Sequence, residues 1–229
     1  MIKMHFVSAH FGGKPPWTLR IQSKSKSVEV STAYYTDANT ASRHLAMHPR
    51  LKAKVPKMLE WQSVDADWYI WMDSSIRITA NDPTSIILDT AGNKKLCLFN
   101  AFPRQSILEE CNAVRQALKT NHEYQSNRYK GEPILDQLIH YYGDKKFTDN
   151  KLFGMTFFAY HRSISHLMQA WFIENVRWSI QDQISFPYVL NSSGIDYSLF
   201  EGKINGSNSL FEWDWRQREK RLDSTSSFN

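Results

Sequence analysis

Short apolar runs alternate along this chain with stretches in which apolar residues recur every three or four positions. The short runs have the length of strands, and they cover Met4–Ala9, Val28–Tyr35, Trp68–Met72, Leu96–Phe99 and Met155–Tyr160. The run Trp68–Met72 is apolar at nearly every position, as expected of a strand that is buried on both faces of a sheet. The pattern therefore predicts strands separated by helices.

Helical periodicity and helix-end signals fill the intervals between these runs. Ser106 and Glu109 form a capping-box pattern, after which an apolar stripe predicts a helix. A second helix is expected to begin at Pro133 and end at Gly143, because proline suits a first helical position and glycine a helix end. A third carries the stripe Ile164, Leu167, Met168, Trp171 and Phe172. We therefore expect an α/β fold with a mixed, mostly parallel sheet flanked by helices, and with ligands beyond the carboxyl ends of the strands.

The chain has 229 residues, of which 41% are hydrophobic and 22% are charged, so it can form one sizeable core. It shows no internal repeat, long glycine- and serine-rich linker or block of charge that would mark a boundary. We expect a single domain over residues 1–222, followed by a short flexible tail, residues 223–229.

No apolar run reaches the roughly 18 residues of a membrane span, and the amino terminus lacks the apolar region of a signal peptide. The two cysteines, Cys97 and Cys111, fit small core residues in a reducing compartment. These features predict a cytoplasmic protein. The net charge of +5 suits phosphate-bearing ligands, nucleic acids or an anionic membrane surface, and by itself it does not choose among them.

Several familiar motifs are absent from the sequence. There is no glycine-rich dinucleotide fingerprint, no P-loop, no Gly-x-Ser-x-Gly elbow and no His-Glu-x-x-His. The eight histidines do not fall into a metal-ligand spacing. The chemistry must therefore be sought in less regular combinations of residues.

The strongest local signal is Asp73, which directly follows the buried run Trp68–Met72. A carboxylate at the carboxyl end of a buried strand can hold a divalent cation against a diphosphate or accept a hydrogen bond from a sugar hydroxyl. The alternative is a carboxylate that only caps the following turn. The nearby Asp65-Ala-Asp67 precedes the strand, so we interpret it as a surface turn away from the site.

A second group of candidates lies upstream of this strand. Tyr35, Thr36 and Asp37 end an earlier strand, and Lys54 and Lys57 follow. An aromatic ring can stack on a base, a carboxylate can bind a ribose hydroxyl, and ammonium groups can neutralise phosphate oxygens. Taken singly, a strand-end tyrosine usually packs in the core and a helical lysine is usually solvated.

The third signal lies near the end of the third helix. Trp171, Glu174 and Trp178 are spaced to share one helix face, which suits stacking on a sugar ring and binding its hydroxyls. Asp182 follows, where a carboxylate could accept the proton of an attacking hydroxyl, and Pro187 is expected to limit the next element to a short one. The competing interpretation is a pair of core tryptophans with a surface ion pair between Glu174 and Arg177.

These segments together resemble the TOD/MUCI-type glycosyltransferase-like family. The resemblance covers roughly residues 30–195 and is most specific in the Trp-Met-Asp-Ser-Ser strand and the Asp-Gln-Ile-Ser-Phe-Pro run that begins at Asp182. It implies a GT-A-like fold and a transferase that uses a nucleotide-diphosphate sugar. Asp73 then occupies the place of the family fold's Asp-x-Asp motif, with Ser75 instead of the second aspartate. Gln181 stands where many members carry arginine.

The resemblance gives each candidate a role. Asp182 is expected to be the catalytic base, while Trp171, Glu174 and Gln183 are expected to bind the acceptor. Donor binding is expected from Tyr35, Thr36, Asp37, Lys54, Lys57, Asp73 and Ser75. A divalent cation, Mn²⁺ or Mg²⁺, would be held at Asp73 more weakly than usual, because Ser75 is a poor ligand.

The expected partners are a nucleotide-diphosphate sugar and a glycan or lipid-linked glycan acceptor, without nucleic acid. The expected process is surface polysaccharide assembly. This process is compatible with peripheral association of the protein at the inner face of the membrane. One alternative is a non-catalytic carbohydrate-binding or scaffold protein, which the incomplete metal motif favours. Another is a metal-dependent phosphodiesterase or nuclease, which requires Asp65, Asp67 and Asp73 to lie together.

Overall fold

The computed structural model describes residues 1–13, 15, 17–41, 44, 47 and 49–213 of the chain. The expected flexible tail, residues 223–229, lies outside these described residues, as do residues 214–222 of the expected domain.

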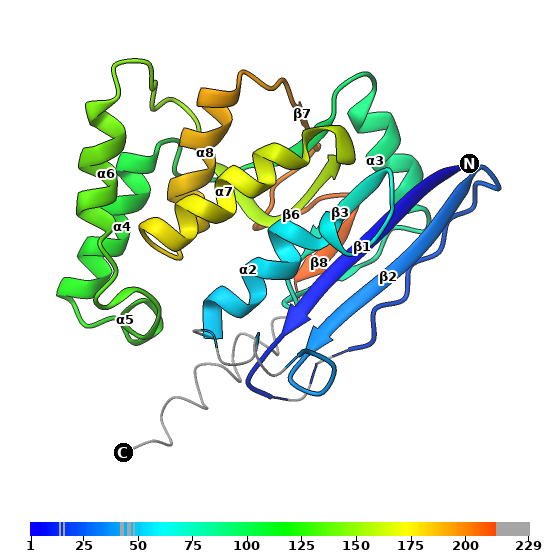
Figure 1. Ribbon diagram of the computed structural model, residues 1–229, viewed down its shortest axis with the longest axis horizontal. Helices are drawn as coiled ribbons and strands as arrows, with labels where there is room; N and C mark the ends of the chain where they lie inside the picture. The colour runs from blue at the N-terminus through cyan, green and yellow to red at the C-terminus, as the bar shows by residue number, and fades with distance from the viewer. Residues whose placement is uncertain (14, 16, 42–43, 45–46, 48, 214–229) are drawn as a thin grey trace.

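A six-stranded sheet forms the centre of the molecule, in the order β2-β1-β3-β6-β5-β7 (Figure 1). Its strands are β1 (Ile2–His10), β2 (Val28–Thr36), β3 (Trp68–Met72), β5 (Leu96–Asn100), β6 (Phe153–His161) and β7 (Ser198–Leu199). The pairs β1–β2, β1–β3 and β5–β7 are parallel, whereas β6 runs antiparallel to both of its neighbours. The expected mixed, mostly parallel sheet is confirmed, and all five predicted runs are strands.

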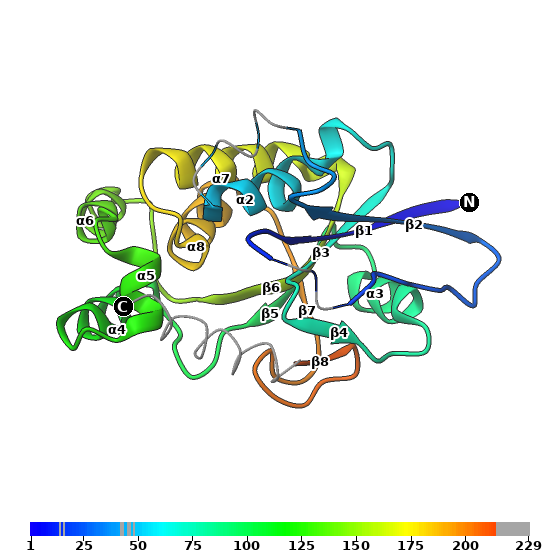
Figure 2. The same ribbon diagram turned by 90° about the horizontal axis from the view of Figure 1, so that it is seen from below.

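Helices cover both faces of this sheet. They are α2 (Pro49–Leu59), α3 (Pro83–Ala91), α4 (Ile107–Lys119), α5 (Glu123–Tyr129), α6 (Ile134–Gly143), α7 (Ser165–Arg177) and α8 (Asp182–Ser193), with short 3-10 turns at η1 (Glu60–Gln62) and η2 (Arg162–Ile164). Figure 2 shows α2, α7 and α8 on one face of the sheet. It shows α3 and the two-stranded ribbon of β4 (Ile76–Ile78) and β8 (Phe211–Trp213) on the other. Helices α4, α5 and α6 lie together beyond one end of the sheet.

The alternation of side chains along β3 divides the core into two clusters. Tyr69 and Trp71 pack on the face that α2, α7 and α8 cover. Trp68, Ile70 and Met72 pack on the opposite face, with α3 and the ribbon. Successive strand residues point to opposite faces, so an entirely apolar strand needs cover on both sides. The prediction that β3 is buried on both faces is confirmed.

The local signals for α4 are largely confirmed. Ser106 caps the helix, and its hydroxyl accepts a hydrogen bond from the backbone N–H of Glu109 (3.1 Å). The Glu109 carboxylate accepts a hydrogen bond from the backbone N–H of Gln105 (2.7 Å). In a standard capping box it would accept from the N-cap residue, Ser106, one position later. Cys111 lies buried on the inner face of α4, as expected.

The expectation of a short element around Pro187 is wrong, because α8 is a helix of 12 residues with this proline inside it. Proline removes one backbone hydrogen bond from a helix. The buried side chains of Phe186, Val189 and Leu190, which pack into the core beside α7, offset that loss.

Among the described helices, none combines the length and the apolar character that crossing a bilayer requires.

Candidate active site

A cavity of about 660 Å³ opens at the carboxyl ends of β1 and β3. Its lining includes Lys54 and Lys57 from α2, Asp73 and Ser75 after β3, and Asp182 and Gln183 from the first turn of α8. Parallel strands place their carboxyl ends at one edge of a sheet, where ligands of α/β proteins commonly bind. Six of the residues expected to form the site therefore meet in one cavity, although they come from three separate parts of the chain.

Asp73 is fixed at this edge by its backbone and by one of its carboxylate oxygens. Its backbone N–H donates to Thr156 O (2.8 Å), which continues the pairing of β3 with β6. Its Oδ1 accepts a hydrogen bond from the indole Nε1 of Trp71 (2.8 Å). The side chain keeps an exposed fraction of 40%, so a ligand in the cavity can reach it.

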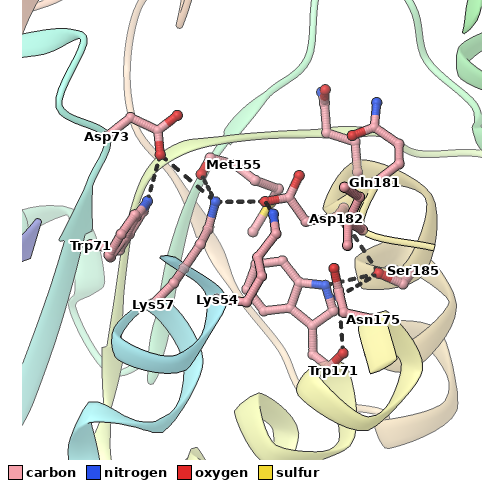
Figure 3. Close-up of polar contacts among 12 residues, drawn as sticks. Lys54, Lys57, Trp71, Asp73, Met155, Trp171, Asn175, Gln181, Asp182 and Ser185 are labelled. Carbon is pink, nitrogen blue, oxygen red and sulfur yellow. Dashed lines mark hydrogen bonds and ion pairs between the residues drawn. The ribbon is translucent and has the colours of Figure 1, made fainter. Parts of the chain in front are cut away.

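Lys54 and Lys57 lie one turn apart on α2 and extend toward the cavity (Figure 3). The ammonium group of Lys57 donates to Met155 O (2.7 Å) and to Asp182 Oδ2 (2.7 Å), and it lies 3.9 Å from Asp73 Oδ1. The ammonium group of Lys54 donates to the same Asp182 oxygen (2.5 Å). Both lysines are buried, whereas helical lysines are usually solvated.

Asp182 therefore holds two cations with one oxygen. Figure 3 shows its second carboxylate oxygen pointing away from both ammonium groups, and within the described residues no hydrogen bond reaches that oxygen. Burial by itself raises the pKa of this carboxyl, but the charges of Lys54 and Lys57 outweigh burial and hold the pKa well below its usual range. As the first residue of α8, Asp182 also lies at the favourable end of the helix dipole.

For Lys54, in contrast to Asp182, the effect of burial on the pKa outweighs that of the neighbouring opposite charge. Its burial lowers its pKa to about 8, because burial disfavours the ammonium form more strongly than the charge of Asp182 favours it. The nearby ammonium group of Lys57 contributes in the same direction as burial. The charge of Lys54 is thus sensitive to pH in the range where most enzymes work.

Trp171 lies beneath Lys57 and outside the cavity. Its side chain is 0% exposed, and its indole N–H donates to Ser185 Oγ (3.0 Å). The ammonium nitrogen of Lys57 lies 5.7 Å from the centre of this ring and 5.3 Å from that of Trp71, within the range of a cation–π interaction. The expected stacking of Trp171 on an acceptor sugar is corrected accordingly, because the face of α7 that bears it packs against α2 and α8.

Glu174 is also corrected from an acceptor ligand to a core residue. It is buried, and its Oε2 accepts a hydrogen bond from the hydroxyl of Tyr141 (2.8 Å). Its Oε1 accepts from Arg177 (3.0 Å), the ion pair that the competing interpretation of this helix face expects. Trp178, the second ring of that face, is half-buried against His140. Glu174 thereby joins α7 to α6.

Tyr35, Thr36 and Asp37 lie at the end of β2 and are not among the residues that line the cavity. The hydroxyl of Tyr35 donates to Glu60 (3.0 Å), and Thr36 bonds to Asn39. Asp37 accepts a hydrogen bond from the backbone of Gly12 (2.7 Å), next to the cavity residue Phe11. Their assignment to the donor nucleoside stays a prediction.

A group of cavity residues had no role assigned from the sequence. The guanidinium Nε of Arg104 donates to Glu110 (2.5 Å), Gln181 donates to the other oxygen of Glu110 (2.6 Å), and Tyr129 donates to Gln181 (2.9 Å). The available signal was the position of Glu110 on the apolar stripe of α4, three residues after Ile107. A carboxylate there must be buried, and a buried charge needs partners.

The donor set around Asp73 limits how a metal ion could be held. Among the described residues, no three histidine, cysteine, aspartate or glutamate side chains converge on one point. Mg²⁺ is often held by one or two carboxylates together with substrate phosphates, and Asp73 fits as one such carboxylate. Ser75 is the neighbouring hydroxyl, and the ammonium group of Lys57 already lies beside Asp73 Oδ1.

Asp65 and Asp67 lie at the opposite end of β3. Asp65 pairs with Lys3 and Arg162, and Asp67 accepts a hydrogen bond from the backbone of Lys3 (2.8 Å). Asp67 and Asp73 are six positions apart along an extended strand, or roughly 20 Å at about 3.3 Å a residue. This separation removes the phosphodiesterase or nuclease alternative, which needs these carboxylates together.

The fold is similar to that of a solved glycosyltransferase, and a second solved structure matches more weakly. The crystal structure of a glycosyltransferase involved in the glycosylation of the major capsid of PBCV-1 matches with a TM-score of 0.52 and 9% identity, over 96% of this chain and 98% of that chain. Mouse xyloside xylosyltransferase 1, in its apo form, matches with a TM-score of 0.47 and 9% identity, over 87% and 85% of the two chains. At 9% identity, the first of these matches shows a likeness of fold alone.

A search of curated protein sequences finds no match. The model of the TOD1/MUCI70 glycosyltransferase-like domain matches residues 40–201, which include Lys54, Lys57, Asp73 and Asp182. This chain therefore belongs to the TOD1/MUCI70 glycosyltransferase-like family and is a transferase with an α/β, GT-A-like fold.

Proposed function

We propose that this protein transfers a sugar from a nucleotide-diphosphate donor to a hydroxyl group of a glycan or lipid-linked glycan acceptor. The observation that carries the proposal is the meeting of Lys54, Lys57 and Asp182 in the cavity, with Asp73 on the other side of Lys57. This arrangement offers cations for a leaving diphosphate and a carboxylate for an attacking hydroxyl at one place.

The two lysines would stabilise the leaving group. A nucleoside diphosphate gains negative charge as its bond to the sugar breaks, and fixed cations that meet this charge lower the barrier. Within the described residues, Lys54 donates one hydrogen bond and Lys57 donates two, so both ammonium groups keep N–H bonds for phosphate oxygens. Their burial strengthens this interaction, since the surroundings screen charge less than water does.

Asp73 would bind the donor from the strand side. Its carboxylate is reachable from the cavity and can accept a hydrogen bond from a donor hydroxyl. A divalent cation, when bound, would take Asp73 as its protein ligand and add positive charge at the diphosphate.

Asp182 would act as the base for the acceptor hydroxyl. Its free oxygen faces away from the lysines, and it is ionised at physiological pH. The lysine pair makes it a weak base in the unliganded protein, because its pKa is low. A bound diphosphate would offset the two ammonium charges, and this raises the pKa of Asp182 at the moment when a proton must be accepted.

The test is incubation with a panel of uridine, guanosine and thymidine diphosphate sugars, with release of the nucleoside diphosphate as the signal. We expect release from at least one donor, and its loss in Lys57→Met. Asp65→Asn, at the far end of β3, is the matched control and should keep wild-type release. Nucleotide binding without any release would instead favour the non-catalytic carbohydrate-binding alternative.

A further inference from the structure

The cavity extends beyond Asp182 to a wall built by α4, α5 and the segment before α4. We call this region the α4–α5 end of the cavity, defined by Arg104, Glu110, Gln125, Arg128, Tyr129 and Gln181. Figure 1 shows that α4 and α5 lie on the side away from β1 and β2. Gln181 directly precedes Asp182, and in the view of Figure 3 Asp182 lies between Gln181 and Asp73.

A chain of buried hydrogen bonds fixes Arg104 at this end. Glu110 is only 3% exposed, and both of its oxygens are occupied, one by Nε of Arg104 and the other by Gln181. Gln181 is held in turn by the hydroxyl of Tyr129. Because Glu110 is almost fully buried and each of its oxygens already accepts a hydrogen bond within this network, its effect is to orient the guanidinium group.

The oriented guanidinium group keeps its outer edge for a ligand. The side chain of Arg104 is 42% exposed, and within the described part of the chain no hydrogen bond involves either of its Nη atoms. Two parallel N–H bonds from a guanidinium group match the two oxygens of a carboxylate or a phosphate. Arg104 is therefore arranged as an anion-binding residue at the cavity wall.

The surroundings of Arg104 add positive charge and a polar acceptor. Arg50 and Arg128 line the same cavity, and both act electrostatically on the Tyr129 hydroxyl, as do Asp182 and Glu110. This end therefore adjoins the proposed base. The Oε1 atom of Gln125 is buried without a hydrogen-bond partner among the described residues, and a hydroxyl or amide N–H of a sugar would satisfy it.

We propose that the α4–α5 end of the cavity is an acceptor subsite in which Arg104 binds an anionic group of the acceptor, a sugar carboxylate or a phosphate. That the bound molecule is an acceptor rests on the proposed function. That the site binds an anion rests only on the contacts of Arg104 described above. In the proposed function the lysines and Asp73 bind the donor diphosphate, whereas Arg104 is joined through Glu110 to Gln181, the residue before Asp182.

The experiment measures dissociation constants by NMR titration with four probes: D-glucuronate, D-glucose, inorganic phosphate and uridine diphosphate. The variants are Arg104→Gln and Arg104→Lys, with Arg115→Gln as the control, because Arg115 is exposed on α4 and is not among the lining residues. We expect glucuronate to bind more tightly than glucose, and Arg104→Gln to weaken glucuronate by about tenfold or more. Arg104→Lys, which keeps the charge and loses the paired N–H groups, should weaken it less, and Arg115→Gln should have no effect.

Uridine diphosphate separates this inference from the proposed function. Its affinity should stay within about twofold of wild type in Arg104→Gln, since other residues hold the donor. If phosphate binds through Arg104 and glucuronate does not, the anionic group is a phosphate ester. Equal binding of glucuronate and glucose without binding of phosphate would overturn the inference, as would a loss of uridine diphosphate affinity alone in Arg104→Gln. Failure of the wild type to bind any nucleoside diphosphate would contradict the donor proposal. Binding of glucuronate or phosphate through Arg104 would still support the anion site in that case.

Discussion

The ammonium group of Lys57 and the Oδ2 atom of Asp182 lie 2.7 Å apart, although 125 positions separate the two residues in the chain. Lys57 also lies 3.9 Å from Asp73, so it joins the carboxylate assigned to the donor with the carboxylate assigned to the acceptor. Both aspartates line the same cavity, as the sequence predicts for two carboxylates on either side of a bound sugar.

Asp73→Asn should lower turnover by about 100-fold or more, the effect of removing a well-placed electrostatic group. Its free energy of unfolding should change by only about 0.5 kcal/mol, because the side chain is partly exposed and asparagine can still accept from Trp71. Steady-state kinetics and urea unfolding measure the two effects. Asp67→Asn, at the other end of β3, is the control and should be nearly silent. Wild-type activity in Asp73→Asn would show that the donor site lies elsewhere.

Asp182→Asn should lower turnover by about 10²–10⁴-fold if the carboxylate is the base. It should also destabilise the protein by about 3–5 kcal/mol, because two buried ammonium groups lose their carboxylate. Affinity for uridine diphosphate, measured by calorimetry, should be unchanged or higher, since the lysines are released from their partner. A clear loss of nucleotide affinity would make Asp182 a donor ligand instead of a base.

Nucleotide affinity should fall as the pH rises through about 8. The pKa of Lys54 is lowered to about 8, so the ammonium form that binds phosphate is present below this pH and is lost above it. The dissociation constant for uridine diphosphate should therefore rise by up to about tenfold per pH unit between pH 8 and 9.5. Lys54→Arg should flatten this profile, because arginine keeps its charge. A profile that is the same in both proteins would mean that Lys54 does not bind the diphosphate.

Removal of divalent cations should weaken nucleotide binding less than tenfold. Asp73 would be a lone protein carboxylate for such an ion, and the two lysines share the neutralisation of the diphosphate. Titration of uridine diphosphate with a chelator, and again with added Mn²⁺, measures the difference. Complete loss of binding in the chelator would show that the ion, and not the lysine pair, holds the donor.

Trp171→Phe should lower stability by about 1–3 kcal/mol and leave the Michaelis constant for the acceptor unchanged. The variant loses the hydrogen bond to Ser185 and part of a fully buried ring. It retains an aromatic ring beneath the ammonium group of Lys57. Urea unfolding and acceptor kinetics test this outcome. A raised Michaelis constant at unchanged stability would restore the acceptor role of this residue.

The strands and the position of Asp73 could be predicted because they depend on neighbours in the sequence. An apolar strand such as Trp68–Met72 can bury all its side chains only if other elements pack on both faces of the sheet. The residue that follows the strand then lies at the edge of the sheet. Caps such as Ser106 are equally local. Lys54 and Lys57 could be named as candidates from their place in the chain between two strand ends, but not as buried residues.

What only the tertiary structure decided is which surfaces meet. Helical periodicity places Trp171 and Glu174 on one face of α7, but it does not say that α2, α6 and α8 cover that face. The same packing buries Lys54 and Lys57, brings Asp182 to them across the chain and joins Arg104 to Glu110 and Gln181. The sequence by itself determined which residues carry charge and where the strands end. Burial and distance decided their chemistry, because the energy of a charge depends on the partners and the solvent that the folded chain leaves around it.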